Sequence, residues 1–193
     1  MKRVLKLIFL TMGLCSCVTS MEDDINLNAT AHEDDDYAES LNKWTKSRTV
    51  IKNFETRYRI TATYLSPDFR SSFARRFKEI YLNEDMKLAE ADKKAGFFVS
   101  LYIPNEDSDD LSNNNHWTVV LKTANGDLRP QIIKKVRDKT RWNPFFSGID
   151  EWSSEFLVVF DTPSMDPKSP DLVASSDLSL VVANADAQVL LEW

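Results

Sequence analysis

Residues 47–65 contain a β-strand signal, which is clearest in the second half of this segment, where apolar and polar residues alternate. The apolar positions there are Tyr58, Ile60, Ala62 and Tyr64, and an arginine or a threonine stands between each pair. Successive side chains of a β-strand point to opposite faces of a sheet, so a period of two predicts a strand with one buried and one solvated face.

A helical pattern follows directly after this strand. Ser66-Pro67-Asp68 has the composition of a helix start, with a capping serine, a proline at the first helical position and an acid in the first turn. The apolar stripe of the helix consists of Phe69, Phe73, Phe77, Ile80 and Tyr81. We expect this stripe to pack on the core, although the arginines beside it leave a partner-binding or membrane-surface role open. Lys93-Lys94-Ala95-Gly96 is typical of a helix end, so the helix is expected to reach Gly96 with a bend near Asn83.

The rest of the chain is rich in strand signals. Strands are expected at residues 97–103, 116–123, 127–137, 155–161, 178–183 and 187–193. Asn125-Gly126 predicts a tight hairpin, because both central residues of such a turn need positive φ. Pro130 has no N–H, so its strand is expected to begin near Gln131 or to lie at a sheet edge. The predicted fold is α+β or mainly β, an antiparallel sheet or sandwich-like domain with one long amphipathic helix packed on it.

The first seventeen residues have a different character. Lys2, Arg3 and Lys6 precede a short apolar run, which Leu14-Cys15-Ser16-Cys17 follows. The run is too short for a membrane span of about 20 residues, and the layout is that of a secretory signal peptide. Residues 14–17 resemble the lipobox of bacterial lipoproteins, which has an aliphatic residue at −3, a small residue at −1 and a cysteine at +1.

The resemblance implies that residues 1–16 are removed as a signal peptide and that Cys17 is the lipid attachment site. Cys15 is a weaker alternative, because it would place the bulky Leu14 at −1. In this class the thiol receives a diacylglycerol and the new amino terminus is usually acylated, and two or more chains anchor a protein stably. Val18 stands where many lipoproteins kept in the inner membrane have an aspartate. The resemblance therefore implies a bacterial cell-envelope protein and favours the outer membrane; periplasmic or surface exposure stays open.

An acidic segment follows the leader. Residues 18–42 hold eight acidic and few apolar residues, a composition that cannot offset the entropy lost on ordering. We therefore expect a lipidated, flexible tether over residues 17–43 and a single globular domain over residues 44–193. A calcium site at residues 32–36 is disfavoured, because the acids are contiguous and lack the spacing and the glycine of a calcium loop.

Charge and cysteine content exclude several classes of function. The formal net charge is −6, and it becomes −9 once Lys2, Arg3 and Lys6 leave with the signal peptide. A nucleic-acid partner is therefore not expected, since it would require a concentrated basic face. Both cysteines lie in the leader, so the mature domain is expected to have no disulfide, zinc–thiolate site or cysteine nucleophile.

Two segments form the candidate binding surface. Trp142, Phe145 and Phe146 either fill one end of the core or line a pocket. Asp107, Asp109 and Asp110 lie in a polar loop that offers oxygen ligands without the spacing of a calcium loop, so no metal is expected. A basic cluster at residues 134–141 either protects a sheet edge from aggregation or binds an anionic glycan or lipid head group.

No motif for catalysis or for a cofactor is present. The chain has two histidines, His32 and His116, and neither a phosphate-binding loop nor a nucleophile elbow. The main hypothesis is a lipid-anchored, non-catalytic binding or structural module whose partners are the membrane and an envelope protein or glycan. The alternatives are an envelope glycan hydrolase with Asp/Glu catalysis and an inhibitor or immunity-type protein. Enzymatic activity thus stays open, but the absence of a catalytic motif argues against it.

Overall fold

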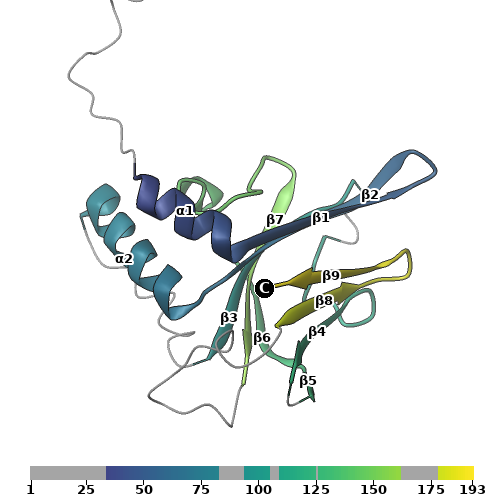
Figure 1. Cartoon of the computed structure of the whole chain (residues 1–193). Coiled ribbons are helices and arrows are strands. Elements are labelled where there is room, and N and C mark those ends of the chain that lie inside the picture. The colour runs from purple at the N-terminus through teal and green to yellow at the C-terminus, as the bar shows by residue number, and fades with distance from the viewer. Residues whose placement is uncertain (1–33, 83–93, 105–108, 125, 162–177) are drawn as a thin grey trace, which may run out of the picture. The chain divides into compact units, whose positions relative to one another are not determined.

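The computed structural model describes residues 34–82, 94–104, 109–124, 126–161 and 178–193 (Figure 1). The leader, Cys17, most of the acidic segment, Asp107 and the bend predicted near Asn83 lie outside these residues. The described residues belong to one compact unit, Asp34–Trp193.

Helix α1, Asp35–Trp44, occupies part of the predicted tether. The Asp34 carboxylate accepts a hydrogen bond from the Tyr37 N–H at 2.9 Å, and acids in the first turn favour the positive end of the helix dipole. Tyr37 and Trp44 are buried. The prediction of a flexible tether up to residue 43 is therefore wrong within this helix, because two aromatic anchors outweigh an otherwise polar composition.

Helix α2, Pro67–Tyr81, begins as predicted. The Ser66 hydroxyl accepts a hydrogen bond from the Phe69 N–H at 3.1 Å, and Phe69, Phe73 and Phe77 of the apolar stripe are buried. The stripe thus belongs to the core.

The end of α2 differs from the prediction. Leu82 adopts a left-handed conformation (φ 55°), and its N–H bonds to the carbonyl of Lys78 at 2.9 Å, which ends the helix. Gly96 lies inside strand β3, Ala95–Tyr102. The prediction that the helix reaches Gly96 is wrong, because pairing of β3 with strands on both sides overrides a local capping signal.

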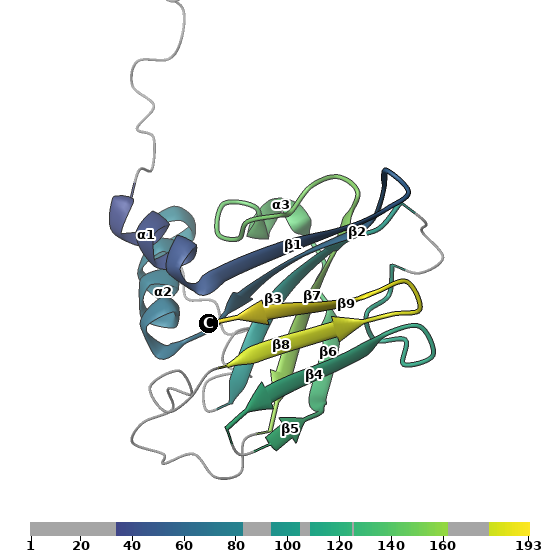
Figure 2. The same cartoon turned by 45° about the vertical axis from the view of Figure 1, so that its right-hand side comes forward.

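Two antiparallel sheets make up most of the unit, which confirms the predicted α+β or mainly β, sandwich-like fold (Figures 1 and 2). The five-stranded sheet has the order β1 (Thr45–Lys52), β2 (Glu55–Tyr64), β3, β7 (Ser153–Phe160) and β6 (Pro130–Lys135). The four-stranded sheet has the order β5 (Gly126–Leu128), β4 (Thr118–Thr123), β8 (Ser179–Ala183) and β9 (Gln188–Glu192).

Two of the segments with a predicted β signal each contain two strands in the structure. Residues 47–65 form a hairpin, β1 and β2, with a turn at Asn53-Phe54. Residues 127–137 cross from one sheet to the other, because β5 pairs with β4 whereas β6 pairs with β7. Pro130 begins β6, and β6 is an edge strand of the five-stranded sheet, as the missing N–H predicts.

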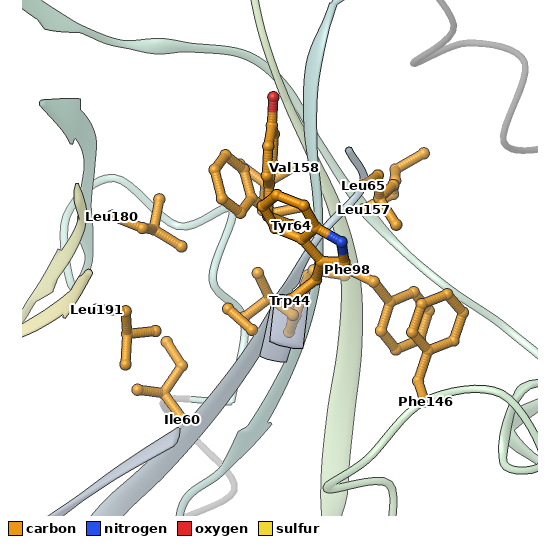
Figure 3. Packing of buried hydrophobic residues seen from close by; sticks show 14 of the residues in the cluster. Trp44, Ile60, Tyr64, Leu65, Phe98, Phe146, Leu157, Val158, Leu180 and Leu191 are labelled. Carbon is orange, nitrogen blue, oxygen red and sulfur yellow. The ribbon is translucent and has the colours of Figure 1, made fainter. Parts of the chain in front are cut away.

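The five-stranded sheet is covered on both faces. Toward the four-stranded sheet, alternate residues such as Ile60 and Val158 belong to the same buried cluster as Leu180 and Leu191 (Figure 3). Toward the helices, Phe98 meets an aromatic layer that includes Phe146. Three layers therefore build one core, with the five-stranded sheet in the middle.

A third helix, α3 (Lys139–Trp142), is a single turn. Among the described residues, no helix combines the length and the apolar composition that crossing a membrane requires.

Candidate binding surfaces

The aromatic residues of the predicted surface lie in the core. Trp142, Phe145 and Phe146 are all buried. Phe146 stacks on Phe98 with ring centroids 3.8 Å apart and planes 6° apart (Figure 3). Phe145 lies edge-on to Phe73, with ring centroids 5.1 Å apart. Of the two predicted alternatives, these side chains fill the core beneath α1 and α2, and Phe145 and Phe146 are not available to a partner.

The described acids of the predicted surface make local bonds. The Asp109 carboxylate accepts hydrogen bonds from Ser154 Oγ at 2.7 Å and Lys135 Nζ at 2.9 Å. Burial opposes its ionisation, but these hydrogen bonds and the charge of Lys135 outweigh burial and lower the pKa of Asp109. Asp110 accepts from the N–H and hydroxyl of Ser112, which holds a turn. Among the described residues, no group of His, Cys, Asp or Glu side chains could hold a metal ion.

These residues do not form one surface. Ser154, which binds Asp109, and Leu157, which pairs with Phe98, have opposite parity on β7 and therefore point to opposite faces of the sheet. Asp109 thus lies on the face toward the four-stranded sheet, and the aromatic residues at 142–146 lie on the helix face.

The turn of the β1–β2 hairpin, which we call the hairpin tip and define as residues 51–54, was not predicted. The hairpin reaches past the ends of the neighbouring strands (Figure 1). At its tip the side chains of Ile51 and Phe54 are 65% and 104% exposed. Asn53 and Phe54 both have positive φ, 55° and 64°, as in a type I′ turn. Asparagine is favoured there, whereas a bulky aromatic residue is an outlier.

A cleft of about 660 Å³ lies beside the hairpin; we call it the end cleft. Its lining includes Arg57, Tyr102, His116, Trp117, Asn184 and Asp186. These side chains come from β2, β3, the start of β4 and the β8–β9 turn, so only the packed sheets bring them together. The volume lies in the range of about 300–1,000 Å³ that is usual for small-molecule sites.

A second cleft, of about 410 Å³, lies at the β6 edge of the five-stranded sheet; we call it the edge cleft. It is lined by Phe98, Lys134, Lys135, Val136, Arg137, Trp142 and Leu157. Trp142 of the predicted surface thus forms part of a cleft wall while most of its ring packs in the core. Three basic residues of the predicted cluster at residues 134–141, Lys134, Lys135 and Arg137, also line this cleft.

Glu155 on β7 is an acid in the interior, and its side chain is 1% exposed. Burial raises the pKa of Glu155 and outweighs the opposing effects, which are the hydrogen bond from Ser153 and the charges of Lys139 and Lys135. A carboxyl with a raised pKa is what a hydrolase needs as general acid. Among the described residues that line the end cleft and the edge cleft, Glu155 does not appear.

We compared the chain with models of protein families, with curated proteins and with solved structures. No match was found. Function must therefore be argued from the residues themselves.

One local sequence pattern could have predicted the exposed hairpin tip. Phe54 stands between polar residues, and Asn53 before it is a typical turn former. The end cleft had no such local signal, because it is lined from at least three separate segments. The edge cleft had a partial one, since the basic cluster at residues 134–141 and Trp142 contribute to its lining.

Proposed function

We propose that the protein is a lipid-anchored lipoprotein of the bacterial cell envelope and acts there as a non-catalytic module that binds a protein partner. The partner-binding surface is the hairpin tip together with the end cleft. The observation that carries this proposal is Phe54, a wholly exposed aromatic side chain on a left-handed backbone.

Phe54 is unfavourable for the isolated fold in two ways. A left-handed conformation costs about 1–2 kcal/mol for a residue with a Cβ. Its ring also stays in water, where burial would contribute about 1.5–3 kcal/mol. Burial against a partner would recover the second contribution, and aromatic side chains are enriched among the residues that dominate binding energies.

The end cleft lies next to the apolar hairpin tip and adds polar groups to the proposed surface. Glu55 and Arg57 follow the tip on β2 and line the cleft. Lys52 Nζ lies 3.4 Å from the carboxylate of Asp186 on the β8–β9 turn, which joins the tip to the far wall of the cleft. An apolar centre with a polar rim is the usual composition of a protein–protein interface.

The proposed location in the envelope rests on the resemblance of residues 14–17 to a lipobox. An outer-membrane position is favoured, because Val18 follows the proposed acylated cysteine.

We expect Phe54→Gly to stabilise the protein and weaken partner binding at the same time. Asn-Gly is the preferred pair for a type I′ turn, so the free energy of unfolding should rise by about 0.5–1 kcal/mol. Loss of the ring should reduce partner affinity by about tenfold or more. Denaturant unfolding measures the first effect, and quantitative pull-down from envelope extracts measures the second.

Leu82→Gly is the matched control, because Leu82 is also left-handed and exposed but lies at the end of α2. It should stabilise to a similar extent and retain the same envelope proteins as the wild type. Equal retention by both variants would contradict the role of the hairpin tip.

We expect Cys17→Ala to abolish acylation and the cut before residue 17, because the thiol that remains in the leader, Cys15, would place the bulky Leu14 at −1. Metabolic labelling with an alkyne-tagged fatty acid and the mass of the mature amino terminus measure both events. Cys15→Ala is the control and should be labelled and processed as the wild type. A Cys17→Ala protein that stays membrane-bound and is cut at the same site would disprove the anchor.

A further inference from the structure

An asparagine holds the loop before β4, which forms one wall of the end cleft. The Asn113 carboxamide oxygen accepts a hydrogen bond from the Asn115 N–H at 3.1 Å, and its carbonyl accepts two more, from the N–H groups of His116 at 3.0 Å and Trp117 at 2.9 Å. Asn115 and His116 are exposed residues of the cleft lining. Within the described part of the chain, neither side chain has a hydrogen-bond partner, so both are available on a wall that is already formed.

A second asparagine holds the β8–β9 turn, which forms another wall of the cleft. The Asn184 carboxamide oxygen accepts hydrogen bonds from the N–H groups of Asp186 at 2.9 Å and Ala187 at 3.1 Å. Since both of these groups are donors, the amide NH₂ of Asn184 points away from them and is a donor of fixed position. The Tyr58 hydroxyl donates to the Ala187 carbonyl at 3.1 Å, which ties the turn to β2. The turn thus offers a donor from Asn184 and an acceptor from Asp186, both pre-organised.

The charges of the end cleft are paired with one another. Arg57 Nη1 lies 3.6 Å from the Glu55 carboxylate, and Lys52 Nζ lies 3.4 Å from the Asp186 carboxylate. An ion of either sign bound here would meet its own charge as well as the opposite one, so the two contributions largely cancel. The cleft therefore favours a neutral ligand that forms many hydrogen bonds.

We propose that the end cleft binds a neutral saccharide unit, carried by the protein partner that docks on the hairpin tip. A sugar hydroxyl both donates and accepts hydrogen bonds, so sugar hydroxyls can bond to the Asn115 amide, the His116 imidazole and the Asn184 amide. The C–H groups of the sugar ring pack on Ile103 and Pro104, which belong to the apolar part of the lining. This inference rests on the proposed function, because the end cleft is one half of the partner-binding surface.

The test uses the full chain in nanodiscs of neutral phosphatidylcholine, titrated calorimetrically with the methyl glycosides of glucose, galactose and mannose. Each sugar is compared with its 2-amino analogue, a cation, and with its uronate, an anion. We expect at least one neutral glycoside to saturate a single site with a millimolar dissociation constant. Its two charged analogues should bind about fivefold or more weakly, because an additional charge must be desolvated without gaining a partner of its own.

Two neighbouring asparagines provide matched variants. Asn114 and Asn115 are both exposed, but of the two only Asn115 lines the end cleft. Asn115→Ala should weaken binding of the glycoside about fivefold, whereas Asn114→Ala should leave it unchanged. His116→Phe keeps a planar ring and removes both ring nitrogens, so it should weaken binding to a similar extent.

Competition tests whether the partner carries the sugar. An excess of the bound glycoside should lower the retention of envelope proteins in the pull-down severalfold, and its charged analogues should lower it less. Undiminished retention would overturn the assignment of the saccharide to the partner.

Three further results would overturn the saccharide site: no saturable binding of a neutral glycoside, equal or tighter binding of a charged analogue, or equal weakening by Asn115→Ala and Asn114→Ala. Each of them leaves the proposed function standing if Phe54→Gly lowers the retention of envelope proteins. Conversely, saturable glycoside binding together with equal retention by Phe54→Gly and Leu82→Gly would contradict the proposed partner surface and confirm the saccharide site.

Discussion

Phe146→Ala should lower the free energy of unfolding by about 3–5 kcal/mol, the largest loss we expect from a single side-chain truncation in this protein. Phe146 is buried between the sheet and α2, stacked on Phe98 at 3.8 Å and 5.6 Å from the ring of Phe73. Removal of the ring leaves a cavity that three packed layers cannot close. Denaturant unfolding, followed by circular dichroism, measures the change.

Phe54→Ala is the matched control for this substitution. The same atoms are removed from a fully exposed ring, so stability should change by no more than about 0.5 kcal/mol. A comparable loss at both positions would mean that the aromatic layer at residues 142–146 contributes no more to stability than an exposed side chain does.

Gly148→Ala should also destabilise strongly. Gly148 has φ 84°, and an added Cβ would lie 2.8 Å from both Cβ and Oγ1 of Thr61. The left-handed backbone contributes about 1–2 kcal/mol, and forcing an atom into a filled space about 1–3 kcal/mol more. The shift would also strain the hydrogen bond from Ser100 Oγ to the Gly148 carbonyl, 2.7 Å in the native fold.

Gly126→Ala separates these two contributions. Gly126 also has positive φ, 122°, but an added Cβ would meet nothing within 4 Å. Its melting temperature should fall by clearly less than that of Gly148→Ala. Equal shifts would show that backbone conformation alone accounts for the effect and that the contact with Thr61 is unimportant.

The aromatic segment illustrates why the candidate binding surface was only partly predictable. An aromatic segment such as Trp142, Phe145 and Phe146 looks the same in the sequence whether it fills a core or lines a pocket. Whether these side chains are buried depends on α1 and α2, which are distant in sequence. Tyr37 of α1 donates a hydrogen bond to the carbonyl of Phe145 at 2.6 Å, a contact across 108 positions that no local pattern encodes.

Local signals also failed where long-range pairing opposed them. Gly96 follows two lysines, as at a helix end, yet it pairs with Val159 in the middle sheet. Arg129 lies where one predicted strand divides between two sheets, because β5 and β6 find different partners. Propensity is weaker than the burial and hydrogen bonding that a whole sheet supplies.

The sequence by itself determined the features that depend on neighbours along the chain: the alternating strand at residues 58–64, the start of α2 at Ser66, and the α+β or mainly β class with antiparallel strands. For Pro130 it left an edge position as one of two alternatives. Period and capping are local properties, so they can be recognised without a structure. Only the tertiary structure decided that Phe145 and Phe146 are core, that Phe54 is exposed and that two clefts exist. Each of these depends on which distant surfaces meet, and that is set by the packing of whole sheets and helices.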